Sequence, residues 1–197
     1  MKNFKGIIYA ALSSSTFGLA PLFSILLLSD GFSSFEVLSY RWGVASLTLG
    51  IIGLAGGCRF RISRQELCTV FFLSLFRAAT SLSLVIAYQN ISSGVASIIH
   101  FMYPLAVALA MALFFRERIS WRTAAAIGVS LAGVALLSTG GIGSRGGDTT
   151  AGTIAAAVSV FAYAGYIIGV RKSRAAQVES TTLTFYVCLL YTSDAAD

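Results

Sequence analysis

The stretch Ser92–Phe115 reads SSGVASIIHFMYPLAVALAMALFF and is followed directly by Arg116-Glu117-Arg118. It contains no aspartate, glutamate, lysine or arginine, and it has the length of a helix that crosses a bilayer, which takes about 20 residues. Charged side chains are costly in hydrocarbon, so the abrupt change to Arg-Glu-Arg indicates where the chain leaves the membrane. The stretch therefore predicts a transmembrane helix.

The rest of the chain has the same character. Of its 197 residues, 56% are hydrophobic and 11% are charged, whereas about 25% of the residues of a soluble domain are charged. Further apolar runs of spanning length occupy Gly6–Leu28, Phe35–Ala55, Glu66–Tyr88, Trp121–Leu137 and Gly152–Val170, and a last run begins at Thr181. The sequence predicts an all-α integral membrane protein, a polytopic helical bundle with six complete transmembrane helices and part of a seventh.

The loops predict the orientation of the bundle. Eleven lysines and arginines lie in the N-terminal segment and in every second loop after it, whereas Arg145 is the one cation of the alternate loops. Cytoplasmic loops carry the excess of basic residues in membrane proteins. We therefore expect a multi-pass protein of the inner (plasma) membrane with a cytoplasmic N-terminus. Because the cations form short clusters and no continuous basic face, we expect no nucleic acid partner.

The N-terminus and the cysteines add two expectations. The first apolar run follows a basic segment and lacks a small-residue cleavage site, so we interpret it as a retained span and not as a signal peptide. Cys58, Cys68 and Cys188 match no metal-binding or redox spacing. We expect no cofactor and no metal site.

The sixth apolar run resembles the first. Aligning Gly6 with Gly152 pairs Ala11 with Ala157 and Ser13 with Ser159. The two runs enter the membrane from opposite sides, as in the inverted repeats from which many secondary transporters are built. We therefore divide the chain into a first repeat of five helices at 1–138 and the incomplete start of a second repeat at 139–187.

The last ten residues, CLLYTSDAAD at 188–197, form a separate segment. They match the translation of a common transposase-based sequencing adapter, and we interpret them as non-native. We expect the native sequence to depart from the printed one near Val187, within an apolar run.

Small residues line one face of two predicted helices. They are Gly43, Ser46, Gly50 and Gly53 in the second run, and Ala124, Gly128 and Ala132 in the fifth. Lipid gives helices no hydrophobic reason to associate, so close approach over small side chains drives their packing. We expect both helices to be packed members of the bundle. The alternative is that small residues are simply common in membrane helices.

Polar side chains on the fourth run predict a cavity wall. Ser93, Ser97, His100 and Pro104 follow one another at steps of four, three and four, which places them on one helical face. Proline removes a backbone hydrogen bond, so Pro104, like Pro21 in the first run, is expected to kink its helix. Interrupted helices near the midplane are where transporters bind their substrates.

Polar groups at membrane depth are expensive, and functional roles are the first interpretation to consider. The candidate substrate-binding residues are His100, Tyr103, Pro104, Ser97, Arg77, Tyr88, Thr16 and Tyr163. For His100 the alternative is a structural hydrogen bond between helices, and for Arg77 it is a bond to a neighbouring helix. For Arg41 we favour such a structural role, or snorkelling towards the headgroups.

Acidic residues are absent from mid-depth of the predicted spans, with Glu36 at the outer mouth and Glu117 at the inner one. Coupling of transport to a proton or another ion would then use His100 or segments outside this chain, and the third alternative is that transport is not coupled. A native chain that stopped near Val187 would need a second copy to complete a cavity, so a homodimer is a further alternative.

Several of these features together form a known pattern. The fourth and fifth runs contain the hydroxyl-rich Ser92–Gly94, the mid-helix Pro104, the cytoplasmic Glu117, and Gly128 with Gly133, and Tyr40–Trp42 holds an arginine between two aromatic residues. This pattern resembles the EamA domain of the drug/metabolite transporter superfamily. The resemblance implies one complete EamA domain, the start of a second, and a fold of ten helices in two inverted repeats. It also implies a central cavity to which the first, third, fourth and sixth helices contribute.

The resemblance implies that the protein is a permease for a small metabolite such as an amino acid, a sugar, a nucleotide-related solute or a drug. We expect alternating access through the central cavity, with the lipid bilayer as the surrounding partner. One alternative is a non-transporting membrane scaffold or receptor. An intramembrane enzyme is less favoured, because the spans contain no paired carboxylates and no nucleophile with a base at plausible spacing.

Overall fold

The computed structural model describes residues 2–58, 60–117, 120–139 and 147–194. Within these ranges it does not describe the side chains of residues 2–5, 9–18, 130, 131, 134, 135, 137–139 and 191–194. The helices are α1 (Lys2–Ser29), α2 (Ser34–Ala55), α3 (Arg64–Asn90), α4 (Ser93–His100), α5 (Tyr103–Phe115), α6 (Trp121–Thr139), α7 (Thr149–Lys172), the short η1 (Arg174–Gln177) and α8 (Ser180–Asp194). The predicted all-α class is confirmed for this part of the chain.

Four helical stretches are long and apolar enough to cross a membrane. They are Ser34–Ala55, Arg64–Asn90, Ser93–Phe115 and Thr149–Lys172. Each coincides with one of the predicted apolar runs, and α1, α6 and α8 begin close to where the remaining runs begin. The number of six complete spans and part of a seventh stays a prediction.

The starts of α2 and α3 are fixed by the same local device. The Ser33 hydroxyl accepts a hydrogen bond from the Glu36 backbone N–H at 3.3 Å, and the Glu36 carboxylate accepts one from the Ser33 backbone N–H at 2.7 Å. Ser63 and Glu66 repeat this arrangement at the start of α3. Each box satisfies N–H groups that have no partner within the helix. The sequence Ser-x-x-Glu therefore sets both boundaries.

The predicted fourth span is interrupted at its centre. The expected kink at Pro104 is a break between α4 and α5 at Phe101 and Met102, and Pro104 lies in the first turn of α5. Proline has no N–H to donate to the His100 carbonyl four residues earlier, and its ring crowds the preceding turn. In contrast, α1 continues as a helix through Pro21.

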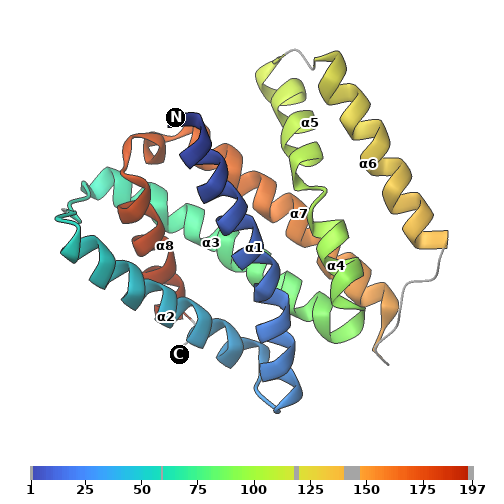
Figure 1. Ribbon diagram of the computed structural model, residues 1–197, viewed down its shortest axis with the longest axis horizontal. Helices are drawn as coiled ribbons and strands as arrows, with labels where there is room; N and C mark the ends of the chain where they lie inside the picture. The colour runs from blue at the N-terminus through green and yellow to red at the C-terminus, as the bar shows by residue number, and fades with distance from the viewer. Residues whose placement is uncertain (1, 59, 118–119, 140–146, 195–197) are drawn as a thin grey trace.

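The helices α3 and α7 form the central pair of the bundle (Figure 1). Glycines of α7 allow this close approach. A Cβ atom added at Gly152 would lie 2.8 Å from Asn90 Cβ and 2.8 Å from Ile91 Cγ2, and one added at Gly165 would lie 3.0 Å from the Phe76 ring. Any larger side chain at Gly152 would therefore push α7 away from the end of α3.

Two apolar clusters close the bundle at opposite ends. One joins the end of α3 to α4 and α7, and it consists of Ala87, Tyr88, Ile91, Val95, Ala96 and Ala156. The other joins the first half of α3 to η1 and α8 through Val70, Leu73, Ala175, Leu183 and Val187. The space between these clusters holds the polar side chains described below.

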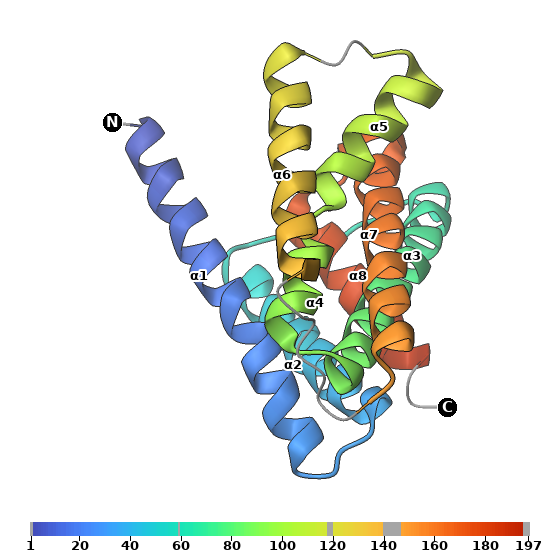
Figure 2. The ribbon, with the colours of Figure 1, turned by 90° about the vertical axis from the view of Figure 1, so that its right-hand side faces the viewer.

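The two helices predicted to pack through small residues, α2 and α6, differ in how closely they are packed. In α2, Ser46 and Gly53 are buried, and Gly50 lies against Phe185 of α8, so this helix is packed as expected. The expectation for α6 was wrong within the described residues, because Ala124 is exposed and a Cβ added at Gly128 would meet nothing within 4 Å. Figure 1 shows α6 at the edge of the bundle beside α5, and Figure 2 shows that edge turned towards the viewer. Small residues permit close packing, but a neighbouring helix must supply the other surface.

Large apolar side chains cover much of the outside. Leu113, Phe114 and Trp121 are 76%, 81% and 82% exposed. A soluble monomer rarely exposes such contiguous apolar surface. With four helices of spanning length, this surface is the one that a multi-pass protein presents to lipid.

Candidate functional site

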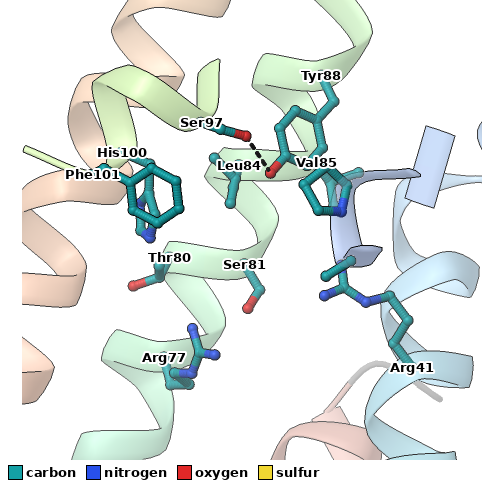
Figure 3. Close-up of a pocket in the computed structure, with 12 residues that line it drawn as sticks. Arg41, Arg77, Thr80, Ser81, Leu84, Val85, Tyr88, Ser97, His100 and Phe101 are labelled. Carbon is teal, nitrogen blue, oxygen red and sulfur yellow. Dashed lines mark hydrogen bonds between the residues drawn. The ribbon is translucent and has the colours of Figure 1, made fainter. Parts of the chain in front are cut away.

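A cavity of about 180 Å³ lies between α1, α2, α3 and α4 (Figure 3). The lining residues are Ala20, Pro21, Arg41, Arg77, Thr80, Ser81, Leu84, Val85, Tyr88, Ser97, His100 and Phe101. The cavity therefore contains two arginines and a histidine, and no acidic residue is among these lining residues.

The cavity occupies one half of the bundle. It follows α3 from Arg77, the middle residue of this 27-residue helix, to Tyr88 near the helix end. Another hollow, lined by Leu28, Ser29, Tyr88 and Gln89, continues beyond Tyr88. In the other half of the bundle, the cluster around Val70 and Leu73 fills the space between α3, η1 and α8. The cavity thus extends from mid-depth towards the loop between α1 and α2.

His100 is held by a hydrogen bond to α7. Its Nδ1 lies 2.9 Å from the Ser159 hydroxyl, which donates its own proton to the Ala156 carbonyl at 2.6 Å. A hydroxyl has one proton to donate, so the Nδ1 atom carries the hydrogen of this contact and Ser159 accepts it. The His100 side chain is 2% exposed. Its other nitrogen, Nε2, has no hydrogen-bond partner among the described residues.

The Arg77 side chain lies close to two aromatic rings. Its guanidinium carbon lies 5.0 Å from the centroid of the Trp42 ring of α2 and 5.2 Å from that of the Tyr163 ring of α7. Both distances fall within the range of cation–π attraction. A ring contact at the guanidinium carbon supplies its N–H groups with no oxygen or nitrogen acceptor. No hydrogen bond or ion pair to these N–H groups comes from the part of the chain that the structure describes.

Arg41 lines the opposite wall of the cavity. Its Nη1 donates to the Ser24 hydroxyl at 2.8 Å, and Ser24 in turn donates to the Ala20 carbonyl at 2.8 Å. This contact joins α2 to α1, as the structural interpretation of Arg41 expects. The same side chain also points towards the cavity in Figure 3.

Hydroxyl groups complete the polar lining. The Tyr88 and Ser97 hydroxyl oxygens lie 3.5 Å apart at the upper end of the cavity in Figure 3. This hydrogen bond joins α3 to α4. The Thr80 hydroxyl donates to the Phe76 carbonyl of its own helix at 2.7 Å. The Ser81 side chain is 9% exposed and has no hydrogen-bond partner among the described residues. It can therefore donate to, or accept from, a molecule in the cavity.

The remaining candidate residues form an aromatic cluster behind His100. The Tyr163 ring lies 5.3 Å from the His100 ring and 4.6 Å from the Tyr103 ring, measured between centroids. Tyr103 and Pro104 line a neighbouring hollow of about 400 Å³ between α5 and α7. Tyr163 thus supports both His100 and Arg77, whereas Pro104 lies away from the cavity.

The structure therefore brings most of the predicted residues together. His100, Ser97, Arg77 and Tyr88 line one cavity, and Tyr163 and Tyr103 pack behind it. The side chain of Thr16 lies outside the described residues, although α1 includes this position. No group of three or more histidines, cysteines or acidic residues that could hold a metal ion occurs in the described ranges.

Several lining residues are absent from the predicted set. Thr80, Ser81 and Leu84 lie three, four and seven residues after Arg77, so helical spacing alone places them on the face of Arg77. Ser159 was paired with Ser13 in the repeat alignment but not predicted at the site. Nothing in its spacing indicates that it meets His100, because the two residues lie on helices of different repeats.

Comparison with known proteins identifies the family. The EamA-like transporter family matches residues 4–139, which span α1 to α6. The chain belongs to this family. The resemblance inferred from the fourth and fifth apolar runs is thus confirmed, and the protein is a multi-pass membrane protein of a transporter family.

One relative of this EamA-family chain is an uncharacterized transporter from Archaeoglobus fulgidus. The two are 32% identical over 133 residues, which is 66% of this chain and 46% of the relative. The chain thus spans about half the length of this curated relative. No solved structure matches this chain.

Proposed function

We propose that this EamA-family protein carries a small polar metabolite across the inner membrane by alternating access. The observation that carries the proposal is the cavity at mid-depth, which places Arg77, His100 and Ser81 around a space of about 180 Å³. Polar groups in a membrane protein usually face a substrate path or a water-filled space. A scaffold or receptor would not require hydrogen-bonding groups to be left without partners there.

The difference between the two halves of the bundle supports alternating access. The cavity continues past Tyr88 towards the loop between α1 and α2, whereas apolar side chains fill the space between α3, η1 and α8 below Arg77. With the N-terminus in the cytoplasm, as the loop cations predict, this is a conformation open to the outside. At the closed end, Lys172 of α7 forms an ion pair with Glu117, after α5, at 3.0 Å.

The orientation has a direct test. Cys58 lies in the loop between α2 and α3, on the side predicted to be cytoplasmic, and it is partly exposed. In a variant whose other cysteines are serine, a membrane-impermeant maleimide should label Cys58 in inverted membrane vesicles and not in intact cells. The reverse result would place the N-terminus outside.

The complete protein is expected to have two EamA repeats, with the second one starting at 139–187 and the printed tail at 188–197 replaced by native sequence. Reading the source DNA past Val187 tests this. About four more apolar spans, with cations on alternate sides, would support the ten-helix carrier. A stop codon shortly after Val187 would favour a homodimer of half-size chains.

Transport itself is tested by counterflow in proteoliposomes made with the complete reading frame. Vesicles preloaded with one unlabelled solute from a panel of amino acids, hydroxy acids and sugars should accumulate the labelled form. A carrier exchanges solute in this way, whereas a scaffold or an enzyme does not. Absence of counterflow for every solute, with folded protein in the vesicles, would contradict the proposal. A dependence of the exchange rate on a pH gradient would reveal proton coupling.

A further inference from the structure

The guanidinium of Arg77 lies at mid-depth and has no hydrogen-bond acceptor or opposite charge among the described residues. It is the middle residue of α3, and its five N–H donors find no hydrogen-bond acceptor or carboxylate among the described residues. A charge at this depth is costly unless an opposite charge or a hydrogen-bond acceptor compensates it. Trp42 and Tyr163 supply ring contacts but no carboxylate, and Arg77 lines the cavity, so a compensating group can reach it from the cavity.

The charge balance of the cavity determines the sign of this group. Arg41 and Arg77 both line it, and none of its described lining residues is acidic. A cationic solute would be repelled, and a neutral solute would leave the charge of Arg77 uncompensated. A carboxylate matches the planar fork of a guanidinium and forms two parallel hydrogen bonds with it. The cavity is therefore suited to a solute that carries a carboxylate group.

His100 adds a second requirement. Its Nδ1 hydrogen is used by Ser159, and the ring is buried next to the same Tyr163 ring that contacts Arg77. A second positive charge beside the Arg77 guanidinium would be costly, so the ring is neutral and Nε2 is a hydrogen-bond acceptor. A solute that satisfies Nε2 must carry an N–H or O–H group close to its anionic end.

We propose that the cavity binds a small carboxylate with an amino or hydroxyl group next to the carboxylate, in the manner of an α-amino or α-hydroxy acid. Arg77 binds the carboxylate, and His100 Nε2 accepts the neighbouring N–H or O–H. Ser81 provides a further hydrogen bond. The inference rests on the proposed carrier function, because it specifies the solute of the same cavity.

The first test is a binding panel with the purified wild-type protein in nanodiscs, using titration calorimetry and no transport step. The probes are serine, lactate, propionate, serinamide, glucose and inorganic phosphate. Serine or lactate should bind, and propionate, which lacks the donor group, should bind about tenfold more weakly, because Nε2 then loses its hydrogen bond. Serinamide and glucose, which lack the carboxylate, should not bind. Preference for serinamide, glucose or phosphate, or no binding of any carboxylate at millimolar concentration, would overturn the proposal.

The second test asks whether the Arg77 guanidinium binds the carboxylate of the solute. Arg77→Gln should weaken binding of serine or lactate by about 30-fold or more, because one partner of a buried charge pair is lost. Arg77→Lys should retain part of the affinity, since it keeps the charge but not the planar fork. Arg64→Gln, the same substitution in the exposed first turn of α3, is the control and should have no effect. Unchanged affinity in Arg77→Gln would overturn the assignment. If Arg77→Gln does not fold, the affinities of Arg77→Lys and wild type for serine or lactate are compared instead. Equal affinities would then overturn the assignment of Arg77 to the carboxylate.

His100→Ala tests the donor requirement separately. It should abolish the difference between lactate and propionate, while both still depend on Arg77. A difference that persists would overturn the role of Nε2. These experiments also separate this inference from the carrier function: binding as predicted without counterflow would contradict transport alone. Counterflow of glucose that is unaffected by Arg77→Gln would contradict the carboxylate site alone.

Discussion

His100 Nδ1 and Ser159 Oγ lie 2.9 Å apart, which joins α4 to α7 across 59 residues of sequence. The contact determines two properties of the cavity at once. It fixes the rotation of the imidazole ring, and it assigns the hydrogen to Nδ1, so that Nε2 is left as an acceptor. Ser159 does not line the cavity, but it thus determines which nitrogen of His100 can accept a hydrogen bond from a solute.

Substitution of Ser159 by alanine tests this relationship. The buried Nδ1–H would lose its acceptor, which costs about 1–3 kcal/mol of the free energy of unfolding. The ring could also turn towards another acceptor, so we expect the affinity for the transported solute to fall about tenfold. Thermal unfolding in detergent and calorimetric binding would measure the two effects.

The control is Ser39→Ala in α2. The Ser39 hydroxyl donates to the Phe35 carbonyl of its own helix, so its loss should change neither property. If Ser159→Ala matched wild type in both measurements, the contact would not position the ring.

Gly152 provides a test of the central pair of helices. Gly152→Ala places a methyl group 2.8 Å from atoms of both Asn90 and Ile91, which are backed by the buried cluster at the end of α3. Overpacking of this kind costs about 1–3 kcal/mol. We expect a lower unfolding temperature, measured by the loss of folded protein after heating in detergent.

Gly94→Ala in α4 is the matched control, because an added Cβ meets nothing within 4 Å there. Alanine favours a helix over glycine by about 1 kcal/mol, so this variant should be at least as stable as wild type. Equal stability of both variants would show that α3 and α7 can separate at no cost.

The thiol of Cys58 should report its contact with Glu179. Cys58 Sγ donates to the Glu179 carboxylate at 2.8 Å, and this hydrogen bond raises the pKa of the thiol above its ordinary value. A higher pKa leaves less thiolate near neutral pH, and the thiolate is the form that reacts. Glu179→Gln should therefore increase the rate of maleimide labelling near neutral pH and shift the rise in rate to lower pH.

This measurement is made in a background in which Cys58 is the remaining cysteine. Asp30→Asn, in the loop at the opposite end of α2, serves as the control for a general change of charge. A rate in Glu179→Gln that equals the rate of the parent at every pH would show that the hydrogen bond is not formed in solution.

The ion pair between Lys172 and Glu117 should add little to stability. Its side chains are 36% and 44% exposed, and exposed ion pairs contribute at most about 1 kcal/mol. A double-mutant cycle with Glu117→Gln and Lys172→Met should therefore give a coupling energy below about 1 kcal/mol, decreasing with salt. A larger value would indicate that water is excluded from this end of the bundle.

The sequence alone predicts the local features of this protein. The position of each helix follows from the length of its apolar run, as for Ser92–Phe115, and the starts of α2 and α3 follow from Ser-x-x-Glu pairs. The break before Pro104 follows from its missing N–H. The face shared by Arg77, Ser81 and Tyr88 follows from helical spacing. All of these depend on residues close together in the chain.

The relationships between helices were decided by the tertiary structure. Sequence spacing places Arg77 at mid-depth, but only the packing of α2 and α7 against α3 brings the rings of Trp42 and Tyr163 within cation–π distance of it. The same packing brings Ser159 to His100 and adds Arg41 to the cavity wall. The rotation of one membrane helix against another depends on how small and large side chains fit, because lipid solvates every apolar face equally well. The position of each helix along the chain can therefore be predicted from the local sequence. The contact partners of a polar side chain depend on how the helices pack against one another.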